Sequence, residues 1–280
     1  MPQQRHPFPG QTVLITGGGS GIGRLMAEGA AARGARVIIW DLSAEAGEQV
    51  ARSIRGRGGE ATAQSVDVTD REAVNRTAQD VGGVDILINN AGIVSGKRFA
   101  DLDHESIERI YAVNVLSLYW VTGAFLPGMR ERGNGAVVTI ASAAGLVGVA
   151  RQTDYSATKF AALGFAESLR MELAKERAGV DSIVVCPYYI NTGMFDGVAT
   201  KFPRLLPILQ PGDAATRILA AIEAGRHQLM MPKLVRALPL MRILPTSLFD
   251  RAMNVLGVNA TMDGFTGRKT AAPPARTPAR

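Results

Sequence analysis

The chain has 280 residues, of which 46% are hydrophobic and 20% are charged. This ordinary globular balance excludes wholesale disorder and permits either one large α/β domain or two small domains. A single cysteine, Cys186, cannot form an intramolecular disulfide, and residues 1–10 lack the apolar core of a secretory signal. The hydropathy pattern predicts no membrane-spanning helix, so we expect a cytoplasmic protein.

The net charge of +6 is concentrated near the C-terminus. Residues 267–280 hold four basic and no acidic residues, which leaves 27 basic and 25 acidic residues, a net charge of +2, in the rest of the chain. A nucleic-acid partner would need basic charge spread over the body of the protein, so none is expected.

We expect an N-terminal arm (1–9), one catalytic domain (10–265) and a disordered basic tail (266–280).

Strand-like and helix-like segments alternate along the domain. Strands are predicted at 12–16, 36–40, 63–68, 84–89, 135–142, 181–186 and 228–231, and helices at 22–33, 44–57, after an N-capping Asp70, 104–132, 155–177 and 213–224. Continuous apolar strands that alternate with helices are typical of a parallel sheet covered on both faces. The pattern predicts a doubly wound Rossmann fold, with a ligand crevice at the carboxyl ends of the strands.

A glycine-rich loop lies between the first predicted strand and its helix. Glycines at this junction permit a tight turn and a close approach of the backbone to a diphosphate, and the helix N-terminus supplies free N–H groups. A flexible turn would also be glycine-rich, but the strand–loop–helix context favours dinucleotide binding. The expected cofactor-binding residues here are Gly17, Ser20, Gly21, Ile22 and Gly23.

Asp41 ends the second predicted strand, 18 residues after Gly23. A carboxylate at this position can accept hydrogen bonds from both ribose hydroxyls of an adenosine and would repel a 2′-phosphate. No Arg or Lys interrupts residues 17–23 or follows directly at Leu42. We therefore expect NAD as cofactor in preference to NADP.

Tyr155 and Lys159 are four residues apart at the start of a predicted helix, and so share one face. A neighbouring ammonium group favours a phenolate, which would make the tyrosine a usable base near neutral pH. Ser142, at the end of the fifth strand, is a candidate for holding a substrate oxygen. Asn114 is a poor helix former inside a predicted helix, which suggests a role such as positioning a water behind Lys159.

Taken together and in order, these motifs resemble the short-chain dehydrogenase/reductase family. The resemblance covers roughly residues 10–230 and rests on 16–23, 89–92, Asn114, Ser142 and 155–159. It implies a seven-stranded sheet, a Ser–Tyr–Lys–Asn catalytic set and assembly into dimers or tetramers. It also implies further cofactor contacts: Asp67 and Val68 beside the adenine, Asn90 near the adenosine ribose with Ala91 and Gly92 following it, Lys159 at the nicotinamide ribose, and Pro187, Ile190 and Thr192 near the carboxamide.

One motif departs from the common family pattern. The usual Pro-Gly after the sixth strand is replaced by Pro187 and two tyrosines, and the run 187–195 resembles the retinol and hydroxysteroid dehydrogenase branch. The substrate loop expected at 188–210 is apolar, as suits a lid over a lipophilic substrate, although packing on the domain or on a second subunit would also explain it. The substrate contacts expected are Ser142, Tyr155, Tyr188, Met194 and Phe195.

The apolar segment 229–257 also carries Lys233, Arg236 and Arg242. It fits a wall of the substrate pocket, an oligomer contact or an amphipathic surface that lies on a membrane. The histidines show no ligand spacing, so no metal is expected.

The sequence thus predicts an oxidoreductase that interconverts a lipophilic alcohol and its carbonyl, with Tyr155 handling the proton. The alternatives are the same chemistry on a small polar alcohol or ketone, or a non-catalytic nucleotide-sensing scaffold.

Overall fold

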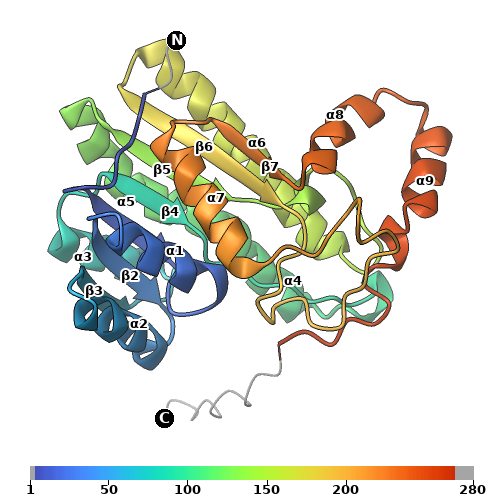
Figure 1. Cartoon of the computed structure of the whole chain (residues 1–280), viewed down its shortest axis with the longest axis horizontal. Coiled ribbons are helices and arrows are strands. Elements are labelled where there is room, and N and C mark those ends of the chain that lie inside the picture. Colours follow the sequence, from blue (N-terminus) through green and yellow to red (C-terminus); the bar gives the residue numbers. More distant parts are fainter. Residues whose placement is uncertain (1–3, 269–280) are drawn as a thin grey trace.

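A seven-stranded parallel sheet forms the centre of the molecule (Figure 1). The computed structural model describes residues 4–268. The strands run in the order β3-β2-β1-β4-β5-β6-β7, so the order reverses between β1 and β4. This is the predicted doubly wound fold. The strands are β1 (Thr12–Thr16), β2 (Arg36–Asp41), β3 (Glu60–Ser65), β4 (Ile86–Asn89), β5 (Gly135–Ile140), β6 (Val180–Pro187) and β7 (Gln228–Met231).

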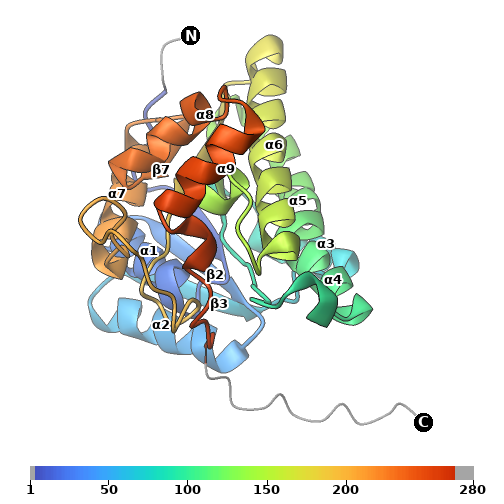
Figure 2. The ribbon, with the colours of Figure 1, turned by 90° about the vertical axis from the view of Figure 1, so that its right-hand side faces the viewer.

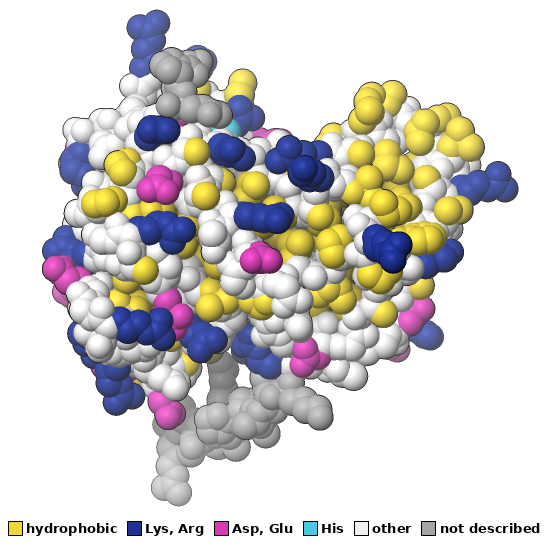
Figure 3. Space-filling model, in the orientation of Figure 1, with side chains coloured by type: hydrophobic (Ala, Val, Ile, Leu, Met, Phe, Trp, Pro, Cys, Tyr) yellow, Lys and Arg dark blue, Asp and Glu magenta, His cyan; other side chains and the backbone are white. Residues whose placement is uncertain are grey.

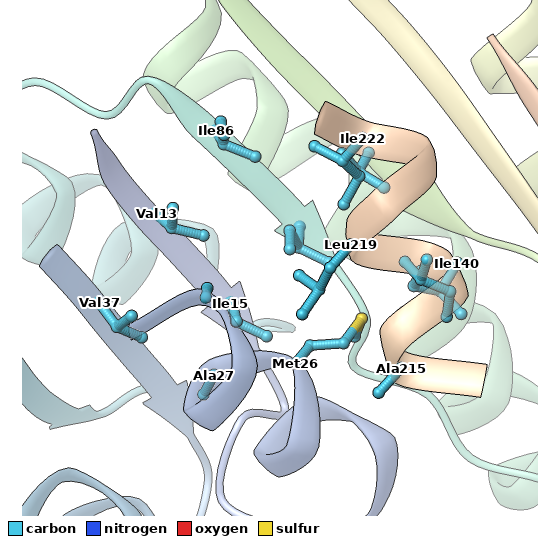
Figure 4. Packing of buried hydrophobic residues seen from close by; sticks show 14 of the residues in the cluster. Val13, Ile15, Met26, Ala27, Val37, Ile86, Ile140, Ala215, Leu219 and Ile222 are labelled. Atoms are coloured by element: carbon cyan, nitrogen blue, oxygen red, sulfur yellow. The ribbon is translucent and has the colours of Figure 1, made fainter. Parts of the chain in front are cut away.

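Helices cover both faces of the sheet. One face carries α1 (Gly21–Ala31), α2 (Ala44–Gly56) and α7 (Pro211–Glu223); the other carries α3 (Arg71–Val81), α4 (His104–Tyr111), α5 (Ser117–Arg132) and α6 (Thr153–Glu176). Successive residues of β1 supply the two faces: Val13 and Ile15 pack under α1 and α7 (Figure 4), and Leu14 packs under α5. Each fully buried aliphatic side chain of this kind stabilises the fold by about 2 kcal/mol.

Most predicted elements lie within two residues of the observed bounds, and two differ by more. The third strand was expected at 63–68, but β3 spans Glu60–Ser65, and the apolar Val66 and Val68 lie in the loop beyond it. Because β3 is an edge strand, it has no continuous apolar run, and the apolar pattern therefore placed the strand three residues too late. The helix expected at 104–132 is interrupted by a π-helical turn, Ala112–Leu116, which separates α4 from α5.

The stretch His104–Arg132 is long and apolar enough to cross a membrane by length and composition, and the sequence expectation was wrong in missing it: residues 110–129 carry no charge. In the fold, 44% of its most apolar window is buried, and α5 packs against α3, β4 and β5. Its apolar face therefore serves the core of the sheet, and its composition is weak evidence for a membrane span.

Residues 4–9 of the predicted arm pack on the domain. The Phe8 side chain is fully buried in the core, and the His6 ring lies 2.9 Å from the Asp181 carboxylate. At the other end, two further helices, α8 (Leu238–Met241) and α9 (Thr246–Val255), form a lobe beyond the carboxyl ends of the strands (Figure 2).

The predicted disordered tail requires one correction. Its first residues, 266–268, pack on the domain, because the backbone N–H groups of Thr266 and Gly267 both donate to the Asp196 carbonyl. Residues 269–280 lie outside the described part of the chain.

Candidate active site

The glycine-rich loop after β1 has the geometry of a phosphate-binding turn. Gly17 and Gly21 adopt φ values of +63° and +55°, which L side chains rarely adopt. A Cβ added at Gly23 would collide with the carbonyl oxygen of Gly17 and lie 2.6 Å from the Asn90 amide. The loop therefore requires glycine at these positions, and it leads directly into the N-terminus of α1.

Asn90 fixes the shape of that loop. Its side-chain amide donates to the carbonyls of Thr16 and Gly17 at 2.9 and 3.1 Å, while the Thr16 hydroxyl accepts from the backbone N–H groups of Asn90 and Ala91. The resemblance implied a place near the adenosine ribose for Asn90. The structure shows its amide bracing the turn between the ends of β1 and β4.

Asp41 lies on the Gly19 side of the loop. One carboxylate oxygen accepts from the Gly19 N–H at 2.8 Å, and the other accepts from the Ser43 N–H at 3.0 Å. Asp67 is held in a similar way by Thr69, through hydrogen bonds of 2.9 and 2.7 Å. Both carboxylates are thus oriented by local hydrogen bonds at the carboxyl-terminal edge of the sheet.

A single cavity of about 330 Å³ joins this loop to the predicted catalytic residues. All of the predicted cofactor and substrate residues line it, namely Gly17, Ser20, Gly21, Ile22, Gly23, Asp41, Asp67, Val68, Asn90, Ala91, Gly92, Ser142, Tyr155, Lys159, Pro187, Tyr188, Ile190, Thr192, Met194 and Phe195. Asn114 is not part of the lining and lies behind the wall formed by Gly92 and Ile93.

Ser142 and Tyr155 both line the cavity and are hydrogen-bonded to each other. The Ser142 hydroxyl accepts from the Ala144 N–H at 3.1 Å and donates to the Pro187 carbonyl at 3.4 Å. Gly145 allows this turn to pack on α6, because a Cβ at this position would lie 2.5 Å from the Lys159 carbonyl oxygen. Burial raises the pKa of Tyr155, and its hydrogen bond with Ser142 offsets part of that rise.

Lys159 is buried one helical turn from Tyr155. Its Nζ donates to the Ile140 carbonyl at 3.0 Å and lies 5.6 Å from the centre of the Tyr155 ring. Burial lowers the pKa of Lys159 to about 8. The sequence expectation that this ammonium lowers the tyrosine pKa is therefore wrong for the protein alone, because desolvation of the phenol dominates.

Asn114 occupies the π-helical turn and connects three segments. Its Oδ1 accepts from the Ile93 N–H at 2.8 Å, and its Nδ2 donates to the Ile93 carbonyl at 2.9 Å and to the Thr158 hydroxyl at 3.0 Å. π-Helical turns are frequent at functional sites. The predicted water-positioning role would use the one remaining lone pair on Oδ1; a Cβ built on Gly92 would lie 3.4 Å from this oxygen and 3.6 Å from Lys159 Nζ.

The far end of the cavity is apolar. Phe195 packs edge-on against Tyr155 and Tyr189, with ring centres 5.7 and 5.0 Å apart, and the lobe contributes Leu238, Met241, Met253 and Leu256. Phe202 and Leu205, also in the substrate loop 188–210, do not line the cavity and have 36% and 54% of their surface exposed.

The cavity lining also contains residues that were not identified from the sequence, among them Gln152, Tyr189 and Arg268. Gln152 and Tyr189 share a buried hydrogen-bond chain with Thr261, whose hydroxyl lies 2.9 Å from the Tyr189 hydroxyl. Tyr189 could have been predicted, because it follows Tyr188 in the motif after the sixth strand. Arg268 could not, because it lies in a segment whose composition suggests a solvated tail.

A switch of strand order at β1 and β4, a glycine turn, and Ser142, Tyr155 and Lys159 on one cavity together define a dinucleotide-binding oxidoreductase. Residues 11–201 match the family model described as short chain dehydrogenase. The chain belongs to the short-chain dehydrogenase family, and it is an NAD(P)-dependent enzyme that interconverts an alcohol and a carbonyl.

The relatives agree with this assignment. The chain is 44% identical to epidermal retinol dehydrogenase 2 of Mus musculus over 95% of its own length and 88% of that protein. It is 36% identical to retinol dehydrogenase 10 of Xenopus tropicalis, over 93% and 86%. Among solved structures, a short-chain dehydrogenase from Streptomyces avermitilis has a TM-score of 0.72 at 29% identity, over 88% and 95%. A metagenomic short-chain oxidoreductase in complex with NADP has a TM-score of 0.66 at 27% identity, over 80% and 96%.

Proposed function

We propose that the protein oxidises a lipophilic alcohol of the retinoid, steroid or long-chain type with NAD, or catalyses the reverse reduction. The observation that carries this proposal is the single cavity that runs from the glycine turn, past Tyr155, to an apolar wall. The names of the relatives, which are retinol dehydrogenases, support a retinoid-like substrate.

The residues present suit a dinucleotide, since the glycine turn carries no side chain at Gly17, Gly21 and Gly23 that a diphosphate would meet, and it leads into the N-terminus of α1. The nicotinamide, when bound, supplies the hydride acceptor or donor. Ser142 holds the substrate oxygen by a hydrogen bond, and Tyr155 takes the hydroxyl proton during oxidation or returns it during reduction. Lys159 holds positive charge beside the phenolate, and Asn114 is a positioning residue that ties α6 to the loop after β4.

NAD is the proposed cofactor because Asp41 presents a carboxylate at the edge of the nucleotide pocket, where a 2′-phosphate would meet like charge. Asp67, Val68, Ala91, Gly92, Pro187, Ile190 and Thr192 complete the proposed cofactor contacts.

The test is a Tyr155→Phe variant assayed at 340 nm with NAD and NADP against retinoids, steroids, fatty alcohols and small polyols. We expect turnover of a lipophilic alcohol with NAD by the wild type, and loss of turnover with retained NAD binding in the variant. Tyr119→Phe, an exposed tyrosine on α5, is the matched control. Near-full activity of Tyr155→Phe would overturn the mechanism, and a preference for small polyols would favour the second substrate class.

We further propose that the lobe contacts a membrane surface peripherally while the rest of the protein stays cytoplasmic. Figure 3 shows hydrophobic side chains gathered over α8 and α9. Leu240 on α8 and Ile243 between the two helices have 71% and 78% of their surface exposed. Replacing both with Gln should reduce binding to phosphatidylserine-containing vesicles, whereas Met171→Gln on α6 should not; equal binding would refute this contact. We also propose that the protein forms a homodimer or a homotetramer. Light scattering of the purified protein would test this proposal.

A further inference from the structure

The last described residues of the chain return to the nucleotide end of the cavity. The C-terminal segment, residues 258–268, runs beside the substrate loop (Figure 1) and is joined to it by backbone hydrogen bonds from Ala199 to Thr261 and from Thr266 and Gly267 to Asp196. Gly197 and Gly264 pack backbone to backbone, too closely for any side chain at Gly197. The substrate loop and the C-terminal segment therefore form one structural unit.

Arg268 extends from this unit onto the glycine turn. Its Nη1 donates to the Ser20 hydroxyl at 3.2 Å, and its Nη2 lies 3.5 Å from the Thr192 carbonyl. The same Nη2 would be 3.5 Å from a Cβ built on Gly21. Asp41, by contrast, accepts from the N–H of Gly19, the residue directly before Ser20. The guanidinium is thus on the side of the loop that faces Thr192.

The electrostatic surroundings of Arg268 favour an anion. Helix α1 begins at Gly21, and its first turn has no acidic residue to balance the positive end of the helix dipole. Within residues 4–268, Arg268 forms no ion pair with a carboxylate, and its partners are a hydroxyl and a carbonyl. A guanidinium and a helix N-terminus that converge on one cavity form a recognition site for a diphosphate.

We propose that Arg268 binds the diphosphate of the dinucleotide and thereby closes the substrate loop over the bound cofactor. This inference rests on the proposed dinucleotide function and adds to it a residue from the C-terminal segment. Because Arg268 is attached to the loop through Asp196, its contact with the diphosphate would hold Thr192, Met194 and Phe195 in place over Tyr155.

The test compares Arg268→Gln with the full-length wild-type chain by calorimetric titration of NAD, NADP, ADP-ribose and adenosine. Loss of a charge-assisted contact should raise the dissociation constants of NAD, NADP and ADP-ribose about tenfold each, and leave that of adenosine unchanged. Arg268→Lys should recover part of the loss. Arg251→Gln, which removes the same charge from an exposed position on α9, is the matched control and should bind as the wild type does.

Hydrogen exchange provides a second readout, because the proposal also concerns the loop. NAD should slow exchange at residues 192–201 and 264–268 in the wild type, and protect only the glycine turn in Arg268→Gln.

Dissociation constants within twofold of the wild type, or a rise confined to NADP, would overturn the proposal; the latter result would assign Arg268 to the 2′-phosphate. Failure of the wild type to bind any of the dinucleotides would instead refute the proposed function itself.

Discussion

The nucleotide end and the substrate end of the cavity are constructed differently. At the nucleotide end, backbone conformation defines the site: glycines in the left-handed region, a helix N-terminus and the locked contacts of Asn90. At the substrate end, side chains from widely separated segments define it, such as Phe195 from the loop and Met253 from α9. A backbone site tolerates few substitutions, whereas a wall of side chains can change shape and specificity while the chemistry is retained.

The Gly23→Ala variant tests whether the glycine turn tolerates a side chain, and it should have the largest effect. The added Cβ would collide with the Gly17 carbonyl and crowd the Asn90 amide, so the turn must shift. We expect NAD affinity to fall more than 100-fold, since about 3 kcal/mol of strain or lost contacts corresponds to that factor. Fluorescence titration with NAD measures the affinity, and circular dichroism verifies the fold.

The matched control is Gly164→Ala on α6, where a Cβ meets no atom within 4 Å. This change should leave NAD binding intact and stabilise the helix by up to about 1 kcal/mol. Normal NAD affinity in Gly23→Ala would show that the turn is more adaptable than its geometry indicates.

The Asp41→Asn variant tests the role of a side chain at the nucleotide end of the cavity. The amide oxygen can still accept from the Gly19 N–H, so the glycine turn should keep its shape, while the charge and the contact with the Ser43 N–H are lost. Removing the like-charge repulsion of about 2 kcal/mol should lower the preference for NAD over NADP roughly 30-fold. The ratio of the two dissociation constants measures this preference. Asp67→Asn, the control, should leave the ratio unchanged, and an unchanged ratio in Asp41→Asn would refute the proposed selectivity.

Phe195→Ala examines the wall of side chains. Loss of part of the apolar contact, about 1.4 kcal/mol, should raise KM for a lipophilic alcohol about tenfold. NAD affinity and the KM for a small alcohol should change little. Steady-state kinetics on the two alcohols separates these effects, and Phe202→Ala, at a partly exposed position, serves as the control. Equal losses on both substrates would mean that Phe195 supports Tyr155 rather than the substrate.

The sequence predicted the nucleotide end of the cavity better than the substrate end. The glycine turn, Asp41 and the Tyr155–Lys159 pair are set by local spacing on a strand or a helix, so the sequence pattern located them on one cavity. The sheet followed from apolar periodicity, except at β3, whose edge position removes the apolar signal.

Other features depend on contacts between distant segments, which periodicity does not encode. The π-helical turn around Asn114 is accompanied by side-chain hydrogen bonds to Ile93 and Thr158, on two other segments. Arg268 reaches the glycine turn only because Asp196 holds the preceding residues. Neither could be predicted from a single sequence without the folded neighbours.

Lys159 links the two ends, and its titration gives the smallest expected effect. Burial lowers its pKa to about 8 from the ordinary value of 10.5 for a lysine side chain. Below pH 8 the group is charged in both the folded and unfolded states. Between these two pKa values, the folded protein releases the proton while the unfolded chain keeps it, so this group's contribution to stability rises with pH. The rise from pH 8 to pH 9 should be about 1 kcal/mol.

Over the same interval, carbonyl reduction should slow, because a neutral Lys159 no longer balances the phenolate that Tyr155 becomes on giving up its proton. Urea denaturation at each pH gives the stability, and Lys159→Met, which lacks the titrating group, isolates the contribution. Stability and reduction rate should therefore diverge above pH 8 in the wild type. If the stability of Lys159→Met still rises between pH 8 and pH 9, another group titrates in this interval. The lysine would then stay charged over the whole interval.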